Sequence, residues 1–189
     1  MRGLLPVDQL IQLSKSNGME SLALTDVNCL SGFINFVKHC NSMDVNPIAG
    51  ANLISKNEDI VVLVENQIGY ENLCRIISKL YDRKDQKISD IIASHFSGLF
   101  ILTEKYSILK QLNSVVSDTH LFVELRPGGS ESEARKLAKK LKLEVVATGN
   151  VYFHNMNDYE SYLILQAIKK NTKIDNIKKE NDGSALNWF

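Results

Sequence analysis

The chain has 189 residues, of which 44% are hydrophobic and 23% charged, and its 22 basic residues balance 22 acidic ones. At about 150 residues per domain, this length gives one domain or little more, and the aliphatic content excludes a largely disordered chain. The zero net charge argues against general nucleic-acid binding, and no apolar run approaches the ~20 residues of a membrane span. Cys29, Cys40 and Cys74 have no paired spacing, which predicts a cytoplasmic protein without disulfides.

Helix-like and strand-like segments alternate along the chain. Apolar residues at helical spacing predict helices over residues 6–17, 32–40, 70–80, 89–93, 106–112, 130–141 and 158–170. Short apolar runs predict six strands over residues 21–25, 47–54, 60–64, 98–103, 121–125 and 144–148. Ser89 is a candidate helix cap, and Ser130 begins a capping box with Glu133. The polar stretch after Asn171 shows no periodicity, so we expect residues 173–189 to be a loosely packed tail or the start of a linker.

Repeated strand–helix units predict an α/β fold. Strands that are apolar on both faces are typical of a mostly parallel sheet covered by helices. Six such strands can form an open doubly wound sheet or an incomplete barrel. Because the chain begins with a helix, a barrel would have a vacant strand position at its start, with unpaired backbone groups on the two neighbouring strands.

Polar residues follow several of the predicted strands, where ligands bind in parallel α/β folds. These residues are Asp26 and Asn28, then Asn52, then residues 124–126, and finally Asn150 and Tyr152. A hydrolytic metal site needs imidazoles and carboxylates that converge within ~2–2.6 Å of the ion. The strand ends offer the carboxylates of Asp26 and Glu124 and otherwise neutral groups. We therefore expect a polar, neutral cleft without a metal.

None of the four histidines forms an H-x-H or H-x3-H pair, the spacings that place two imidazoles on one face. His154 is the one histidine with a candidate role. If the last strand continued beyond residue 148, its alternation would point Asn150, Tyr152 and His154 to one side. Asp26, Glu124 and His154 then make up a residual, incomplete site, to which Asp158 is a further candidate contributor.

Five basic residues lie on one flank of the helix over 130–141 and just after it: Arg135, Lys136, Lys139, Lys140 and Lys142. Exposed lysines are the norm on protein surfaces, and Glu131 and Glu133 offset the first turn, so a solvated face is the favoured interpretation. The alternative is a DNA or partner face. Direct DNA binding would weaken steeply with salt because phosphate contacts release counterions, and the balanced net charge argues for weak binding or none.

Seven segments together resemble the PHP (polymerase and histidinol phosphatase) domain, in the form found at the N-terminus of bacterial DNA polymerase III alpha subunits. They fall in the family's order and spacing at residues 3–10, 23–26, 46–50, 69–74, 98–102, 123–125 and 146–152. The resemblance spans residues 3 to 172. It implies a distorted seven-stranded (β/α) barrel, here lacking its first strand, with residues 1–172 as the domain.

In active members of this family, a cluster of zinc, manganese or iron sits at the carboxyl ends of the strands. The resemblance implies that this chain begins just after the strand that carries an H-x-H pair. The family's Thr-Asp-His becomes Thr25-Asp26-Val27, its Gly-x-Glu becomes Gly50-Ala51-Asn52, and its Asp-x-His becomes Asn150-Val151-Tyr152. Among the matched ligand positions Asp26, Val27, Asn52, Asn150 and Tyr152, only the first keeps a charge, so we expect neither a metal cofactor nor catalytic residues.

The resemblance implies a catalytically inactive domain with a structural and interaction role in DNA replication. Its expected partners are the polymerase body of the same chain and a proofreading or clamp-associated subunit, with no membrane. Trp188 and Phe189 at the terminus suggest a fragment of a longer polymerase. The alternative is a metal-dependent phosphoesterase or 3'-5' exonuclease with a site rearranged around Asp26, Glu124 and His154.

Overall fold

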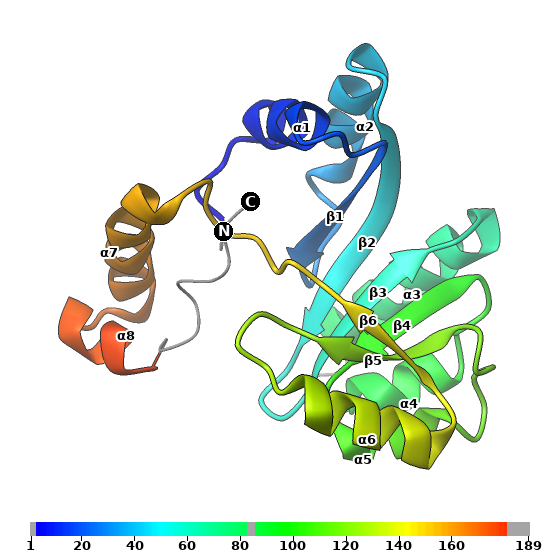
Figure 1. The fold of residues 1–189 in the computed structure, drawn as a ribbon. Helices are drawn as coiled ribbons and strands as arrows, with labels where there is room; N and C mark the ends of the chain where they lie inside the picture. The colour runs from blue at the N-terminus through cyan, green and yellow to red at the C-terminus, as the bar shows by residue number, and fades with distance from the viewer. Residues whose placement is uncertain (1–2, 83–85, 181–189) are drawn as a thin grey trace.

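The computed structural model describes residues 3–82 and 86–180, and it contains one six-stranded sheet with helices packed on its outside (Figure 1). The strands are β1 (Ser21–Val27), β2 (Asn46–Ile54), β3 (Asp59–Val64), β4 (Leu99–Thr103), β5 (Leu121–Leu125) and β6 (Glu144–Ala147). The helices are α1 (Val7–Ser16), α2 (Phe33–Ser42), α3 (Gln67–Asp82), α4 (Ile88–Ala93), α5 (Tyr106–Leu112), α6 (Glu131–Leu141), α7 (Tyr159–Lys170) and α8 (Ile174–Glu180), with a short 3-10 helix η1 (Met156–Asp158). Every predicted strand and helix is present, with small shifts at the ends.

The strands lie in the sheet in chain order, but one of them is reversed. β3 pairs antiparallel with both β2 and β4, whereas the other neighbours pair in parallel. The mostly parallel sheet predicted from sequence is therefore a mixed one, because the short turn at residues 55–58 allows only a hairpin between β2 and β3. The carboxyl ends of the five remaining strands and the amino end of β3 meet at one rim, which we call the carboxyl edge.

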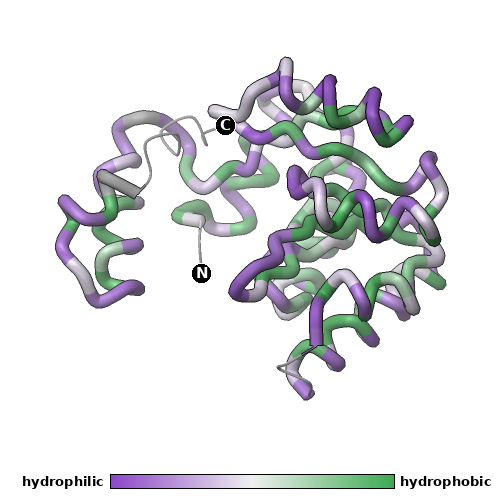
Figure 2. The backbone as a smooth tube through the Cα atoms, turned by 90° about the horizontal axis from the view of Figure 1, so that it is seen from below, coloured by the Kyte–Doolittle hydropathy of each residue, from purple (hydrophilic) through white to green (hydrophobic). Residues whose placement is uncertain are grey.

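The register divides the sheet into an outer face and a concave face, because residues paired across strands point to the same side. The outer row is fully buried beneath helices α3 to α6 and includes Ala51, Val62, Ile101 and Leu121. The concave row includes Val27, Asn52, Val61, Leu102 and Phe122. In Figure 2 the hydrophobic segments gather in the sheet and along the inner sides of its helices. The main core thus lies on the outer face, between sheet and helices.

Helices α7 and α8 lie beside the sheet rather than on either of its faces (Figures 1 and 2). They share a separate apolar cluster built on Phe153, Tyr162, Leu163, Ala167 and Ile177. Ile177 is fully buried there, so the expectation of a loosely packed tail is wrong for residues 174–180. The remainder of the predicted tail, with Trp188 and Phe189, lies outside the described residues. Along the described chain no helix is long and apolar enough to cross a membrane.

The two predicted helix caps have different outcomes. Ser130 caps α6 as expected, since its hydroxyl accepts from the backbone N–H of Glu133 at 3.3 Å. Ser89 is not the cap of α4, because the helix begins one residue earlier and Ser89 lies buried inside it. The carboxylate of Glu58 takes that role from the β2–β3 turn: it accepts from the backbone N–H of Ile88 at 2.5 Å and from the Ser89 hydroxyl at 2.5 Å.

We predict that Glu58→Ala lowers the free energy of unfolding by about 1–3 kcal/mol, because buried N–H groups at the start of α4 lose their acceptor. Urea unfolding followed by circular dichroism measures this loss. Glu104→Ala, which removes an exposed carboxylate, is the control and should change stability by less than about 0.5 kcal/mol. Equal effects of the two substitutions would contradict the capping role of Glu58.

Candidate functional site at the carboxyl edge

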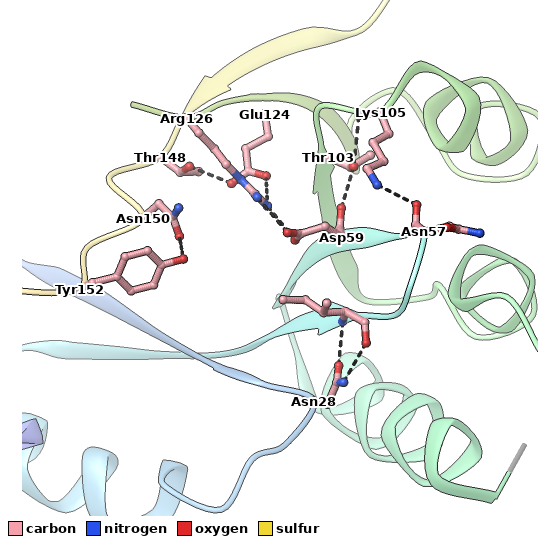
Figure 3. A network of polar contacts seen from close by, with 11 residues as sticks. Asn28, Asn57, Asp59, Thr103, Lys105, Glu124, Arg126, Thr148, Asn150 and Tyr152 are labelled. Atoms are coloured by element: carbon pink, nitrogen blue, oxygen red, sulfur yellow. Dashed lines mark hydrogen bonds and ion pairs between the residues drawn. The ribbon is translucent and has the colours of Figure 1, made fainter. Parts of the chain in front are cut away.

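An arginine lies between two carboxylates at the carboxyl edge (Figure 3). The guanidinium of Arg126, just after β5, donates to both oxygens of Asp59 at 2.9 and 3.1 Å. The same guanidinium lies 2.9 Å from the carboxylate of Glu124. Asp59 begins β3 and Glu124 lies near the end of β5, so the reversal of β3 brings its first residue to this edge.

Two threonines extend this ion-pair network to neighbouring strands. Thr148, just after β6, donates its hydroxyl to Glu124 Oε1 at 2.8 Å, and Thr103, at the end of β4, donates to the backbone carbonyl of Asp59 at 2.9 Å. The network therefore connects the tips of β3, β4 and β5 with the segment after β6. Little water reaches it: the side chain of Glu124 is 1% exposed and that of Arg126 is 16% exposed.

Attraction between one guanidinium and two neighbouring carboxylates stabilises this cluster although it is largely buried. Burial by itself would lower the pKa of Arg126, but hydrogen bonds and charge attraction from Asp59 and Glu124 raise it above its ordinary value. The guanidinium is consequently a permanent cation. Removing one partner of such a buried group leaves an uncompensated charge, which costs far more than losing an exposed ion pair.

Three further polar side chains at this edge bind one another or the backbone, whereas the buried Asn52 Oδ1 has no hydrogen-bond partner among the described residues. Asn28 adopts a positive φ of 54° and holds the backbone of Ile54 through both of its amide atoms, at 2.8 and 2.9 Å. The Tyr152 hydroxyl donates to Asn150 Oδ1 at 2.8 Å. Asn28, Asn150 and Tyr152 therefore contribute neutral hydrogen-bonding groups at the edge that also holds the ionic cluster.

The structure separates residues that the sequence placed in one cleft. Val27 pairs with Asn52 on the concave face, whereas Asp26 pairs with Ala51 and therefore points to the outer face. A side-chain carbon at Gly32 would come within 2.9 Å of the Asp26 carboxylate, so this carboxylate lies over the residue before α2. The one charged group among the predicted ligand positions thus faces away from the edge network.

The last strand does not continue through His154, so the condition for placing Asn150, Tyr152 and His154 on one side is not met. β6 ends at Ala147, and Asn150 has a positive φ of 45°, which breaks the extended alternation. His154 follows Phe153, whose ring is buried in the cluster beneath α7. Asp158 lies farther on, at the start of α7.

These residues do not fit the metal cluster that the family resemblance implies. In the part of the chain that the structure describes, no three His, Cys, Asp or Glu side chains are grouped so that they could hold an ion. Asp26, Glu124 and His154 are accordingly not brought together. Asn52 offers one buried neutral oxygen, and Glu124 is held by Arg126. A divalent ion at this edge would have to displace a covalently attached cation.

Sequence reasoning placed Arg126 among the polar residues that follow the strands but gave it no role, and it missed Asp59. The available signal was Glu124-Leu125-Arg126 at a strand end, in which alternation places the acid and the arginine on the same face. Asp59 had no such signal, because its place at the edge depends on the direction of β3.

Two of the five basic residues at α6 have contacts within the domain. Arg135 lies 2.6 Å from Glu131 one turn earlier, and Lys140 sits 4.4 Å above the ring of Tyr106. Lys136, Lys139 and Lys142 are exposed. Part of the predicted DNA or partner face is thus used for packing and helix pairing, which reduces the charge available to a phosphate backbone.

We predict that Arg126→Met lowers the free energy of unfolding by about 3–5 kcal/mol, because Asp59 and Glu124 are left as unpaired, poorly hydrated like charges. Chemical unfolding of the two proteins measures the difference. Arg75→Met is the matched control, since its i,i+4 pair with Glu71 is exposed and worth less than about 0.5 kcal/mol. Adding Glu124→Gln to Arg126→Met should restore part of the stability, and a double variant that is less stable still would contradict the ion-pair assignment.

Comparison with known proteins shows which proteins this chain is similar to. The DNA polymerase III subunit alpha of Pasteurella multocida (strain Pm70) is 27% identical over 212 residues, which cover 95% of this chain and 18% of that protein. The corresponding subunit of Escherichia coli (strain K12) is 27% identical and covers 99% of this chain and 19% of that protein. The chain therefore spans less than a fifth of the length of these relatives.

A solved structure shows the same fold at much lower identity. An amidohydrolase from Chromobacterium violaceum, with bound sulfate and no metal, aligns with a TM-score of 0.54 at 8% identity, over 80% of this chain and 84% of that one. The sequence model of the PHP domain matches residues 1–177, nearly the whole chain. This chain belongs to the PHP domain family, whose distorted (β/α) barrel its sheet follows.

Proposed function

We propose that this chain is a PHP domain without phosphoester hydrolysis, which serves as a structural and interaction domain of a DNA polymerase III alpha-type protein in replication. The observation that carries the proposal is the ion pairing of Arg126 with Asp59 and Glu124 at the carboxyl edge. Similarity to polymerase III alpha subunits along almost the whole chain supports the replication context.

Hydrolysis by metal-activated water needs an ion with an open coordination position, which lowers the pKa of bound water to ~7. A guanidinium has five N–H donors and no coordination position, so it can balance carboxylates without activating water. At this edge Nη1 and Nη2 of Arg126 donate to Asp59, and Nη2 also lies 2.9 Å from the carboxylate of Glu124. The chemistry available here therefore holds strand tips together, which is what a scaffold requires.

A scaffold role also suits the surroundings of the edge. Asn28 and Asn150 fix backbone and side chains through hydrogen bonds rather than presenting reactive groups. We propose that the domain needs no metal cofactor, that it works in the cytoplasm, where Cys29, Cys40 and Cys74 stay free thiols, and that its partners are a polymerase body and a proofreading or clamp-associated subunit.

We predict that the purified chain binds manganese and zinc at well below one ion per molecule and does not hydrolyse p-nitrophenyl phosphate or a single-stranded oligonucleotide in either metal. Elemental analysis and turnover assays measure both properties. EDTA should leave the melting temperature unchanged, because Arg126 supplies the cation. Tight stoichiometric metal together with turnover would overturn the proposal.

The alternative, a phosphoesterase with a rearranged site, makes the opposite prediction. If Asp26, Glu124 and His154 act with Asp158 in another arrangement, then Asp26→Ala and His154→Ala each abolish any activity detected. Turnover that survives both substitutions would eliminate this alternative and would point to a contaminating enzyme, which repurification by a second column then tests.

A further inference from the structure

A second polar cluster lies at the opposite rim of the sheet, which we call the amino edge. There β3 ends at Val64, while β4 and β5 begin at Leu99 and Leu121. Glu65 directly follows β3 and His120 directly precedes β5, so the reversal of β3 brings a carboxylate and an imidazole to the same rim. The His120 Nε2 atom lies 3.3 Å from Glu65 Oε2. This pair is at the other end of the sheet from the carboxyl edge, and the proposed function does not use it.

The other ring nitrogen of His120 faces a hydroxyl. Thr119 Oγ1 lies 2.9 Å from His120 Nδ1. A carboxylate only accepts hydrogen bonds, so Nε2 carries the proton of the neutral ring, and Nδ1 keeps a lone pair that accepts the Thr119 hydroxyl. Thr119, His120 and Glu65 therefore form one chain of hydrogen bonds from hydroxyl to imidazole to carboxylate. In this order of groups an imidazole can act as a base toward the hydroxyl.

Neighbouring groups hold the imidazole in place. Its ring stacks on Phe100 of β4, with the two centroids 4.9 Å apart and the planes inclined by 12°. The backbone N–H of His120 donates to the carbonyl of Ser117 at 2.9 Å. On the carboxylate side, Asn66 Nδ2 donates to Glu65 Oε2 at 3.1 Å. A ring that is oriented in this way stays within reach of the hydroxyl, which a freely rotating surface histidine does not.

The cluster is open to small reagents. Thr119 is exposed, and the side chains of His120 and Glu65 are 29% and 40% exposed. Ser117 Oγ also lies 2.9 Å from Thr119 Oγ1, and its own hydroxyl donates to Asp118 at 3.3 Å. Ser117 is thus a competing acceptor for the Thr119 hydroxyl. Of the two acceptors, only the imidazole is basic enough to take the proton near neutral pH.

From this geometry we infer that Thr119 is an acyl-acceptor site, whose hydroxyl takes an acyl group from an activated ester. Thr119 Oγ1 attacks the carbonyl carbon of the ester and forms a new ester bond with it. The bond between that carbon and the leaving oxygen breaks, and the hydroxyl proton passes to His120 Nδ1 and then to the leaving oxygen. His120 acts as the base, and Glu65 is a positioning residue that fixes the ring.

The experiment treats the full 189-residue chain with p-nitrophenyl acetate and locates the acetyl groups by peptide mass spectrometry. Ser114 in the same molecule is the matched control, because its exposed hydroxyl donates to the backbone carbonyl of Gln111 instead of an imidazole. Thr119 should be acetylated about tenfold faster than Ser114 or more, which is a modest effect for a general base at an exposed site.

Substitutions at three positions separate the roles of hydroxyl, base and competing acceptor. His120→Gln keeps a hydrogen-bonding side chain but removes the base, so acetylation of Thr119 should fall to the rate of Ser114. Thr119→Ser keeps the hydroxyl and should still be modified, whereas Thr119→Val should not. Ser117→Ala removes the competing acceptor and should leave the rate at Thr119 unchanged or higher. Circular dichroism checks that each variant is folded.

Glu65 acts through His120, so its test needs a measurement on the ring itself. Nitrogen NMR of the labelled His120 ring should show the neutral tautomer with its proton on Nε2 in the parent and a mixture of tautomers in Glu65→Leu. Acetylation of Thr119 should be several-fold slower in Glu65→Leu. Glu65→Gln, whose amide oxygen still accepts from Nε2, should keep the parent tautomer. Glu71→Gln, at an exposed position of α3, is the control and should change neither property.

Three outcomes contradict the inference. These are equal acetylation of Thr119 and Ser114, an undiminished rate at Thr119 in folded His120→Gln, and a neutral parent ring with its proton on Nδ1. None of them bears on the metal and turnover tests of the carboxyl edge. Failure of the acyl-acceptor site is therefore distinguishable from failure of the non-catalytic assignment.

Discussion

The carboxyl edge depends on one buried ion-pair cluster, in which a single guanidinium donates hydrogen bonds to Asp59 and forms an ion pair with Glu124, from a different strand. A cation is required there because Asp59 and Glu124 lie together with little access to water. In an active PHP barrel, as the resemblance implies, metal ions supply such positive charge. In this chain the charge is covalently attached through Arg126, so it cannot leave, cannot be chelated, and cannot offer a coordination position to water. Arg126 thus supplies the positive charge that the two carboxylates need, and this charge holds strands together but does not activate water for hydrolysis.

The sequence alone was sufficient for the element order and for the family. Strands such as β4 and β5 are short, mainly apolar runs between clear helices, and the capping box at Ser130 marks the start of α6 without tertiary information. Local patterns of this kind depend on neighbours within a few residues. For that reason they were predicted correctly even where the boundaries moved by up to three residues.

What sequence missed was set by contacts between distant segments. Glu58 caps α4 across 30 residues and leaves no local pattern. The pair of Arg126 with Glu124 is local, but its pair with Asp59 spans 67 residues and has no local pattern either. Ile177 is buried because α8 packs against α7. The polar sequence around it has no periodic pattern that would predict this packing. The face taken by Asp26 follows from the register of β1 with β2, and a shift of one residue would have reversed it.

The hairpin that reverses β3 decides which end of that strand lies at the carboxyl edge of the sheet. Had a crossover helix joined β2 to β3, the segment would run the other way, and its last residue, Val64, would stand where Asp59 does now. Asp59 would then lie at the opposite edge of the sheet, too far away to pair with the guanidinium of Arg126. A turn of four residues is too short for anything but a hairpin, so its length alone fixes the direction of β3. That direction places the carboxylate of Asp59 at the carboxyl edge and so determines the charge at the edge where active members of this family bind metal, as the resemblance implies.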